Sequence, residues 1–97
     1  MQILQNFNKA FESKARLGIM SVLLVNDEVS FNSLKDLLSL TDGNLATHLR
    51  ALEEATYISV KKEFIGRKPS TTYSVTEAGK KAFNDHLNAL ESFLKGS

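Results

Sequence analysis

The stretch TDGNLATHLRALEE, residues 41–54, decides the fold. Three of its leucines recur at spacings of four and three, and they are Leu45, Leu49 and Leu52. Because a helix turns by about 100° per residue, these side chains share one narrow face, which predicts a helix over 42–55 held to the core by that stripe. Thr41 is a favourable N-cap, and Asp42 suits the positive end of the helix dipole.

The face opposite the leucines carries small and hydrogen-bonding side chains. Asparagine can bond the edge of adenine twice, arginine can do the same with guanine, and threonine offers a hydroxyl and a methyl group. We therefore expect a DNA recognition helix in which Asn44 and Thr47, near its start, contact bases. Arg50, one turn further, reaches either a base or a phosphate. His48 lies at the edge of the core, where it packs, contacts a phosphate or reads a base.

The elements on either side of this helix complete a winged helix-turn-helix. In chain order we expect an N-terminal arm (1–12), a first helix (13–25), a second helix (32–39), the recognition helix (42–55), a hairpin (58–75) and a C-terminal helix (76–95). Ser13 and Thr76 are the expected N-caps of the first and last helices, and Asn32 or Ser30 caps the second. The fold class is α+β, mostly α, with a two-stranded wing and a C-terminal dimerisation helix. A generic α+β domain with the same order is the alternative.

The hairpin concentrates positive charge on a chain whose net charge is only +1. Four cations stand against the single anion Glu63, and they are Lys61, Lys62, Arg67 and Lys68. Alternation puts Lys62 on the half-buried side with Val60 and Phe64, and Lys61 on the other, with a turn over 66–70. Cations on a projecting hairpin can neutralise phosphates, and Arg67 is placed to enter a minor groove. A hairpin tip that only solubilises the domain is the alternative.

Apolar stripes lie at both ends of the chain. One contains Phe83, Leu87, Leu90 and Leu94, and the other contains Ile3, Phe7 and Phe11. A domain this small cannot readily cover both stripes, so we expect the terminal helices to pair in a two-fold homodimer. The alternative is a C-terminal helix that folds back on its own core.

Composition narrows the classes of function. The 97 residues fit one domain, 1–97, and the absence of cysteine rules out disulfides and thiolate metal sites. Neither His48 nor His86 has a second ligand at useful spacing, and no nucleophile–base pair or phosphate-binding glycine loop is present, so we expect no metal, no cofactor and no enzyme. With no apolar run of about 18 residues and no secretory signal, we expect a cytoplasmic protein without a membrane partner.

The segments now described resemble a known group of proteins. They are FNSLK (31–35), LTDGNLATHLRALEEA (40–55), FIGRKPSTTY (64–73) and VTEAG (75–79), and together they are similar to compact winged-helix transcriptional regulators related to the MarR and ArsR families. The resemblance covers about residues 16–94. It implies a prokaryotic, cytoplasmic, homodimeric DNA-binding protein that acts on transcription. The DNA-binding positions it implies are Asn44, Thr47, His48 and Arg50 on the recognition helix, and Arg67 and Lys68 on the wing.

Two features depart from that family. Its members usually have glycine where this chain has Thr56, and a β-branched residue in a left-handed conformation there costs about 1–2 kcal/mol. The alternative is a helix that ends differently and re-aims the wing. The cysteine-rich metal-sensing motif of ArsR-like sensors is absent.

The expected function is binding of a palindromic double-stranded operator by a homodimeric regulator that represses transcription. A winged-helix module that binds a protein partner instead of DNA is the alternative. Whether a small-molecule effector exists stays open, because an apolar pocket between helices has no sequence signature.

Overall fold

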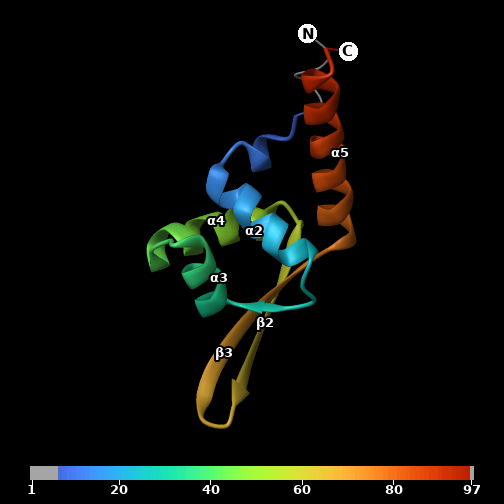
Figure 1. The fold of residues 1–97 in the computed structure, drawn as a ribbon. Coiled ribbons are helices and arrows are strands. Elements are labelled where there is room, and N and C mark those ends of the chain that lie inside the picture. Colours follow the sequence, from blue (N-terminus) through green and yellow to red (C-terminus); the bar gives the residue numbers. More distant parts are fainter. Residues whose placement is uncertain (1–6, 97) are drawn as a thin grey trace.

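A computed structural model describes residues 7–96 of the chain as five helical segments and one small sheet (Figure 1). The elements are the 3-10 helix η1 (Lys9–Phe11), α2 (Lys14–Leu24), β1 (Val29–Ser30), α3 (Phe31–Leu38), α4 (Asp42–Glu54), β2 (Ile58–Ile65), β3 (Lys68–Val75) and α5 (Glu77–Leu94). The molecule measures 54 × 25 × 21 Å and is elongated, with the β2–β3 hairpin at one end and α5 at the other. The predicted winged-helix order is confirmed.

The N-caps of three helices are those expected from the sequence. The caps are Ser13, Thr41 and Thr76, whose side-chain oxygens accept hydrogen bonds from the backbone N–H groups of Arg16, Asn44 and Gly79. Of the two candidates for α3, Ser30 is the cap, so this helix begins at Phe31 rather than residue 32. It ends at Leu38 because Ser39 turns into the left-handed conformation, with φ 54°.

The sheet is antiparallel, with strand order β1–β3–β2. The pairing of β2 with β3 runs from Ile58–Val75 to Ile65–Lys68, so only Gly66 and Arg67 form the turn. The longer turn predicted over 66–70 is wrong. Gly66 has φ +66° and no positive φ follows at Arg67, as in the type II′ turn whose twist matches that of paired strands. The ladder therefore continues to the tip, and Lys68 lies in a strand.

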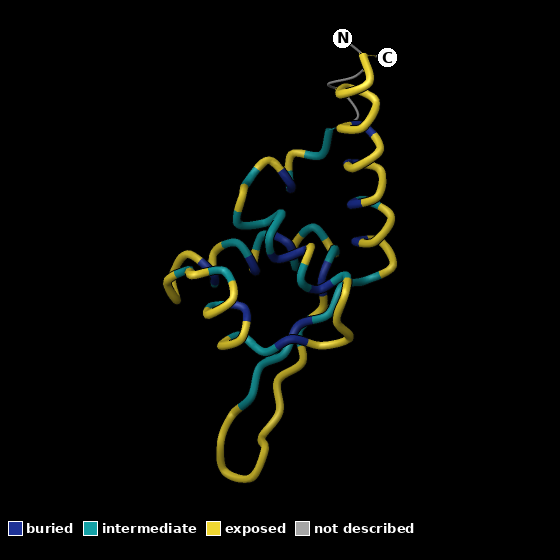
Figure 2. Tube along the Cα trace, in the orientation of Figure 1, coloured by how far each residue is buried: buried dark blue, intermediate teal, exposed yellow. Residues whose placement is uncertain are grey.

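The core lies where α2, α3 and α4 pack on the end of the sheet that is away from the β2–β3 turn, and its residues are dark blue in Figure 2. The predicted leucine stripe of α4 is confirmed as its centre, since Leu45, Leu49 and Leu52 are at most 1% exposed. The other core side chains are Phe11, Ile19, Met20, Leu23, Val29, Leu34, Ile58, Tyr73 and Phe83.

The far half of the wing lies beyond this core. Ile58 is buried and Val60 packs against the core, but Phe64 and Ile65 are 74% and 66% exposed. The prediction that Phe64 lies on a half-buried face is wrong. The alternation along β2 is right, but the strand extends past the helices, so no apolar surface remains for Phe64 to cover.

The junction between α4 and the wing holds the unusual Thr56. Its φ is 67°, so this β-branched residue takes the left-handed conformation. The N–H of Thr56 donates to the carbonyl of Glu53 and the N–H of Tyr57 to that of Leu52, which is the Schellman arrangement that ends a helix. The Thr76 hydroxyl donates to the Thr56 carbonyl at 2.7 Å, and this bond ties the start of α5 to the end of α4.

Candidate nucleic-acid interface

The outward face of α4 carries the polar residues that the sequence predicted to contact bases. Asn44, Thr47 and Arg50 are all exposed on it. The Thr47 hydroxyl donates to the carbonyl of Gly43 at 2.9 Å, which leaves its methyl group and oxygen lone pairs facing outward. Asp42, at the start of the helix, forms an ion pair with Lys35 of α3 at 2.9 Å. Its negative charge is therefore partly compensated at the start of the helix.

A hollow of about 450 Å³ separates α4 from the wing. Its lining residues are Ala46, Leu49, Arg50, Glu53, Glu54, Val60, Lys62 and Tyr73. Lys62 thus shares a face with Val60 and Tyr73, as the alternation along β2 predicted. Burial, and secondarily the charge of Glu53, raises the pKa of the Tyr73 hydroxyl.

Lys61 lies on the other face of the wing and is engaged within the protein. Its Nζ is 3.0 Å from Oε2 of Glu28 and 3.9 Å from Oε1 of Glu63. The hydrogen bond to Glu28, with the charges of both carboxylates, raises the pKa of Lys61. Lys61 and Lys62 thus lie on opposite faces of the wing, as the alternation along the strand predicted, and only Lys61 is paired with Glu28.

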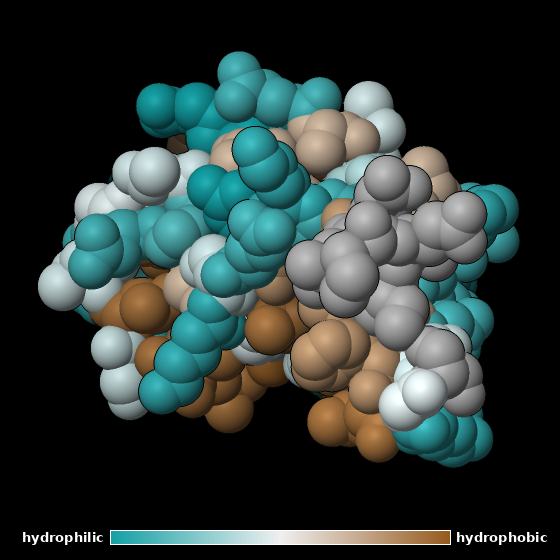
Figure 3. All heavy atoms as spheres, turned by 90° about the horizontal axis from the view of Figure 1, so that it is seen from above, coloured by the Kyte–Doolittle hydropathy of each residue, from teal (hydrophilic) through white to brown (hydrophobic). Residues whose placement is uncertain are grey.

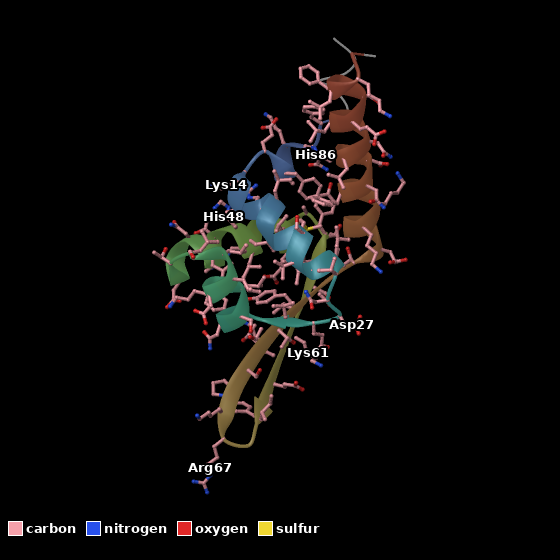
Figure 4. All side chains as sticks on the ribbon, viewed as in Figure 1. Lys14, Asp27, His48, Lys61, Arg67 and His86 are labelled. Atoms are coloured by element: carbon pink, nitrogen blue, oxygen red, sulfur yellow. The ribbon has the colours of Figure 1, made fainter. Side chains whose placement is uncertain are left out.

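The wing tip carries the remaining predicted cations. Arg67 occupies the two-residue turn and extends away from the body of the protein (Figure 4), and Lys68 is the first residue of β3. Both are exposed, as are their apolar neighbours Phe64 and Ile65. The tip is therefore a mixed cationic and apolar surface, whose apolar part the sequence interpretation missed.

His48 contacts a residue that sequence reasoning did not select. The Nε–H of Arg16, in α2, donates to Nδ1 of His48 at 3.1 Å, and His48 itself is half-buried. The contact joins α2 to α4 across 32 positions of sequence. It depends on how two helices pack, and no local pattern signals it.

The predicted dimer residues divide into buried and exposed groups. Phe11 and Phe83 are 1% and 4% exposed within the single chain, and their rings meet edge to face at 5.2 Å. Their place in the dimer stripe is therefore corrected, because α5 folds back on its own core through these residues, as the alternative allowed. Ile3 lies outside the described residues.

The remaining large apolar residues of α5 face solvent in the single chain. Leu87, Leu90, Phe93 and Leu94 are 42%, 39%, 51% and 75% exposed. Figure 3, viewed from the α5 end of the molecule, shows brown apolar groups at the surface next to teal polar ones. Phe7 is half-buried and packs against Phe93 and His86, with ring centroids 6.2 and 5.4 Å apart.

His86 has a structural role in this region. It is 7% exposed, and its Nδ1 accepts the backbone N–H of Asn8 at 3.1 Å, which ties the segment before η1 to α5. Over residues 7–96, no three His, Cys, Asp or Glu side chains gather closely enough to hold a metal ion. Within the same range, no helix combines the length and apolarity needed to cross a membrane.

The sequence from residue 15 to residue 94 matches the family model described as a winged helix DNA-binding domain. The chain belongs to this family. A relative of this winged-helix protein, an uncharacterized protein from Methanocaldococcus jannaschii, is 38% identical over 79 residues, which cover 81% of this chain and 86% of the relative. The structure of a transcriptional regulator homologue from Pyrococcus horikoshii is 30% identical, with a TM-score of 0.78 over 99% of this chain and 97% of the other.

More distant structures share the fold. MarR is 19% identical, with a TM-score of 0.72 over 88% of this winged-helix chain and 64% of MarR. An ArsR family transcriptional regulator is 14% identical, with a TM-score of 0.62 over 99% and 94% of the two chains. PadR from Bacillus subtilis, solved in complex with operator DNA, is 17% identical, with a TM-score of 0.66 over 74% of this chain and 46% of PadR. The expected resemblance to MarR and ArsR regulators is confirmed.

Proposed function

We propose that this winged-helix protein is a sequence-specific, double-stranded DNA-binding transcriptional regulator. The observation that carries the proposal is the exposed polar face of α4, with Asn44 and Thr47 beside a projecting cationic wing. The likeness of the fold to PadR, which was solved with operator DNA, supports the same use here. Nothing in this arrangement calls for a catalytic step, and we propose no enzymatic activity.

In the proposed complex, α4 enters the major groove. Asn44 and Thr47 lie in its first turns, where recognition helices contact base edges, and Arg50 reaches a base or a phosphate one turn later. Lys62 contacts the backbone from the face of the wing that continues the surface of α4, while Arg67 and Lys68 contact it from the tip. Lys61 is held by Glu28 and contributes least.

We propose further that the protein acts as a homodimer on a palindromic operator and represses transcription. The exposed residues of α5, Leu87, Leu90, Phe93 and Leu94, supply an apolar surface that a second copy would cover. A two-fold dimer presents two recognition helices to two half-sites, so the operator would carry the same symmetry. A dimer seated on a promoter blocks access of the polymerase, which favours repression over activation.

The DNA-binding proposal is tested by mobility shift of genomic fragments at several salt concentrations. We expect a shifted fragment whose affinity falls steeply with salt, since phosphate contacts release counterions. Lys68→Ala weakens binding to every fragment by a similar factor, whereas Lys80→Ala, on α5 and paired with Glu77, is the matched control that leaves it unchanged. If the wild-type protein shifts no fragment at any salt concentration, while a pull-down recovers a stoichiometric protein partner, the proposal is wrong.

The dimer is tested by sedimentation at micromolar concentration. We expect twice the monomer mass for the wild type and the monomer mass for Leu90→Glu, because the new charge would be buried against the partner. Leu37→Glu, which replaces a leucine that is 65% exposed on α3, is the matched control and leaves the mass unchanged. A wild-type protein that sediments as a monomer contradicts the dimer. Run-off transcription from a promoter that contains the selected site then separates repression from activation.

A further inference from the structure

We propose that Lys14 and Arg16 of α2, together with His48 of α4, form a second phosphate-binding surface on the flank of α4 opposite the wing. The inference rests on the proposed function, because it needs α4 to lie in a DNA groove. It assigns to α2, a helix outside the helix-turn-helix pair and the wing, a direct part in binding the DNA backbone.

The placement follows from the directions of side chains around α4. With Leu45, Leu49 and Leu52 facing the core, a turn of about 100° per residue sends Ala46 and Glu53 to one flank. Both line the hollow beside the wing, so that flank is the wing side. The same turn sends His48 to the opposite flank, where Arg16 contacts it. Figure 4 shows both Lys14 and His48 far from Arg67 at the wing tip.

The chemistry of this flank suits a phosphate. Because Nδ1 of His48 accepts the Nε–H of Arg16, the proton of the neutral ring is on Nε2, whose N–H is left as a donor. The other guanidinium N–H groups of Arg16 have no hydrogen-bond partner within residues 7–96. Lys14 is exposed. Across the same residues, neither Lys14 nor Arg16 forms an ion pair, even with Glu12, which is close to both in sequence. Within residues 7–96, donors of all three side chains are therefore left without a partner, and no carboxylate pairs with Lys14 or Arg16.

The dimensions of DNA explain why both flanks of α4 matter. The major groove of B-DNA is about 12 Å wide, and a helix with its side chains is about 10–12 Å across. A helix that fills the groove has a phosphate backbone along each flank. The wing side meets one backbone through Lys62, and the Arg16 side meets the other. Contacts on both backbones fix the orientation of the helix in the groove without reading sequence.

The test is fluorescence anisotropy with the full chain and two labelled duplexes, one shifted by the wild type and one of random sequence. Measurements run from about 50 to 300 mM KCl, a range in which phosphate contacts are strongly screened. We expect Lys14→Ala and Arg16→Ala each to weaken binding to both duplexes by the same factor, roughly fivefold at the lowest salt. Each substitution also reduces the slope of log K against log salt by about 0.9 for every phosphate that is no longer neutralised, or about 1.8 for a dimer. Lys80→Ala is the matched control and changes neither.

Two results distinguish failure of this inference from failure of the proposed function. If the wild type binds neither duplex, the proposed function is wrong and this surface has no role. If the wild type binds with a steep salt dependence and Lys14→Ala and Arg16→Ala keep the wild-type slope, only this inference is overturned. Arg16 is half-buried, so thermal melting checks that its variant folds, and exposed Lys14 gives the same test without that risk. Arg16→Lys keeps the charge but loses the bond to His48, and we expect it to retain the wild-type slope.

Discussion

Substitution of Gly79 by alanine tests the junction that sets the direction of α5. Gly79 is buried in the first turn of that helix, and a Cβ there would lie 2.0 Å from the carbonyl oxygen of Tyr57 and 3.0 Å from Cγ2 of Val75. The atom at 2.0 Å is backbone and cannot rotate away. It also accepts the N–H of Thr76 at 3.0 Å, so any shift that admits the methyl group stretches the bond that begins α5.

The magnitude follows from three contributions. Overpacking costs about 1–3 kcal/mol, and the upper end applies because the clash is with backbone. Weakening of the Thr76 to Tyr57 bond adds about 1 kcal/mol, whereas the higher helix propensity of alanine returns about 1 kcal/mol. We therefore expect Gly79→Ala to lower the free energy of unfolding by about 2–3 kcal/mol. For a domain of this size that is a fall in Tm of roughly 10–20 °C.

The assay is urea unfolding followed by circular dichroism, at one protein concentration so that any dimer contributes equally. Gly43→Ala is the matched control, because it makes the same change in the first turn of α4, where a Cβ meets nothing within 4 Å. We expect it to raise stability slightly, by up to about 1 kcal/mol. Equal stabilities for the two variants would refute the close approach of α5 to Tyr57.

Three further predictions concern local features of the fold. Thr56→Gly raises the free energy of unfolding by about 0.5–1 kcal/mol in the same assay, because relief of left-handed strain outweighs the added freedom of the unfolded chain. A destabilised variant would contradict this. Phe64→Ala changes stability by less than about 0.5 kcal/mol while Ile58→Ala costs about 2–4 kcal/mol, and equal losses would show that the wing tip is packed. The free energy of unfolding falls as pH rises above 10.0, because the raised pKa of Tyr73 keeps its hydroxyl protonated in the folded state after it has ionised in the unfolded chain. Measured against pH, this free energy falls less steeply for Tyr73→Phe, and parallel curves for the two proteins would exclude this cause.

The local patterns of the sequence predicted most of the fold. Leu45, Leu49 and Leu52 recur with helical spacing, and that spacing alone places them in the core. Ser13 and Thr41 are caps because a short side-chain oxygen before a helix can accept a free N–H, which is a property of a few neighbouring residues. The element order and the winged-helix fold follow from such features.

The features that the sequence did not predict depend on how segments far apart in the chain pack together. The exposure of Phe64 is set by where the helices stop covering the sheet, and the alternation along β2 carries no information on that point. The turn is shorter than predicted because Pro69 belongs to β3. At that position β3 pairs with β2 alone and is an edge strand, where a proline does not end the strand. The contact between Arg16 and His48 joins residues 32 positions apart and is created only by the packing of α2 on α4.

Sequencing of DNA selected from a random duplex library tests most directly whether the exposed face of α4 reads bases. Three proteins are compared at the same salt concentration: the wild type, Asn44→Ala and Lys80→Ala. We predict an enriched palindromic motif for the wild type, the same motif for Lys80→Ala, and for Asn44→Ala a motif that loses its preference at one symmetric pair of positions. No enrichment by the wild type, or an unchanged motif for Asn44→Ala, would contradict base recognition by this face.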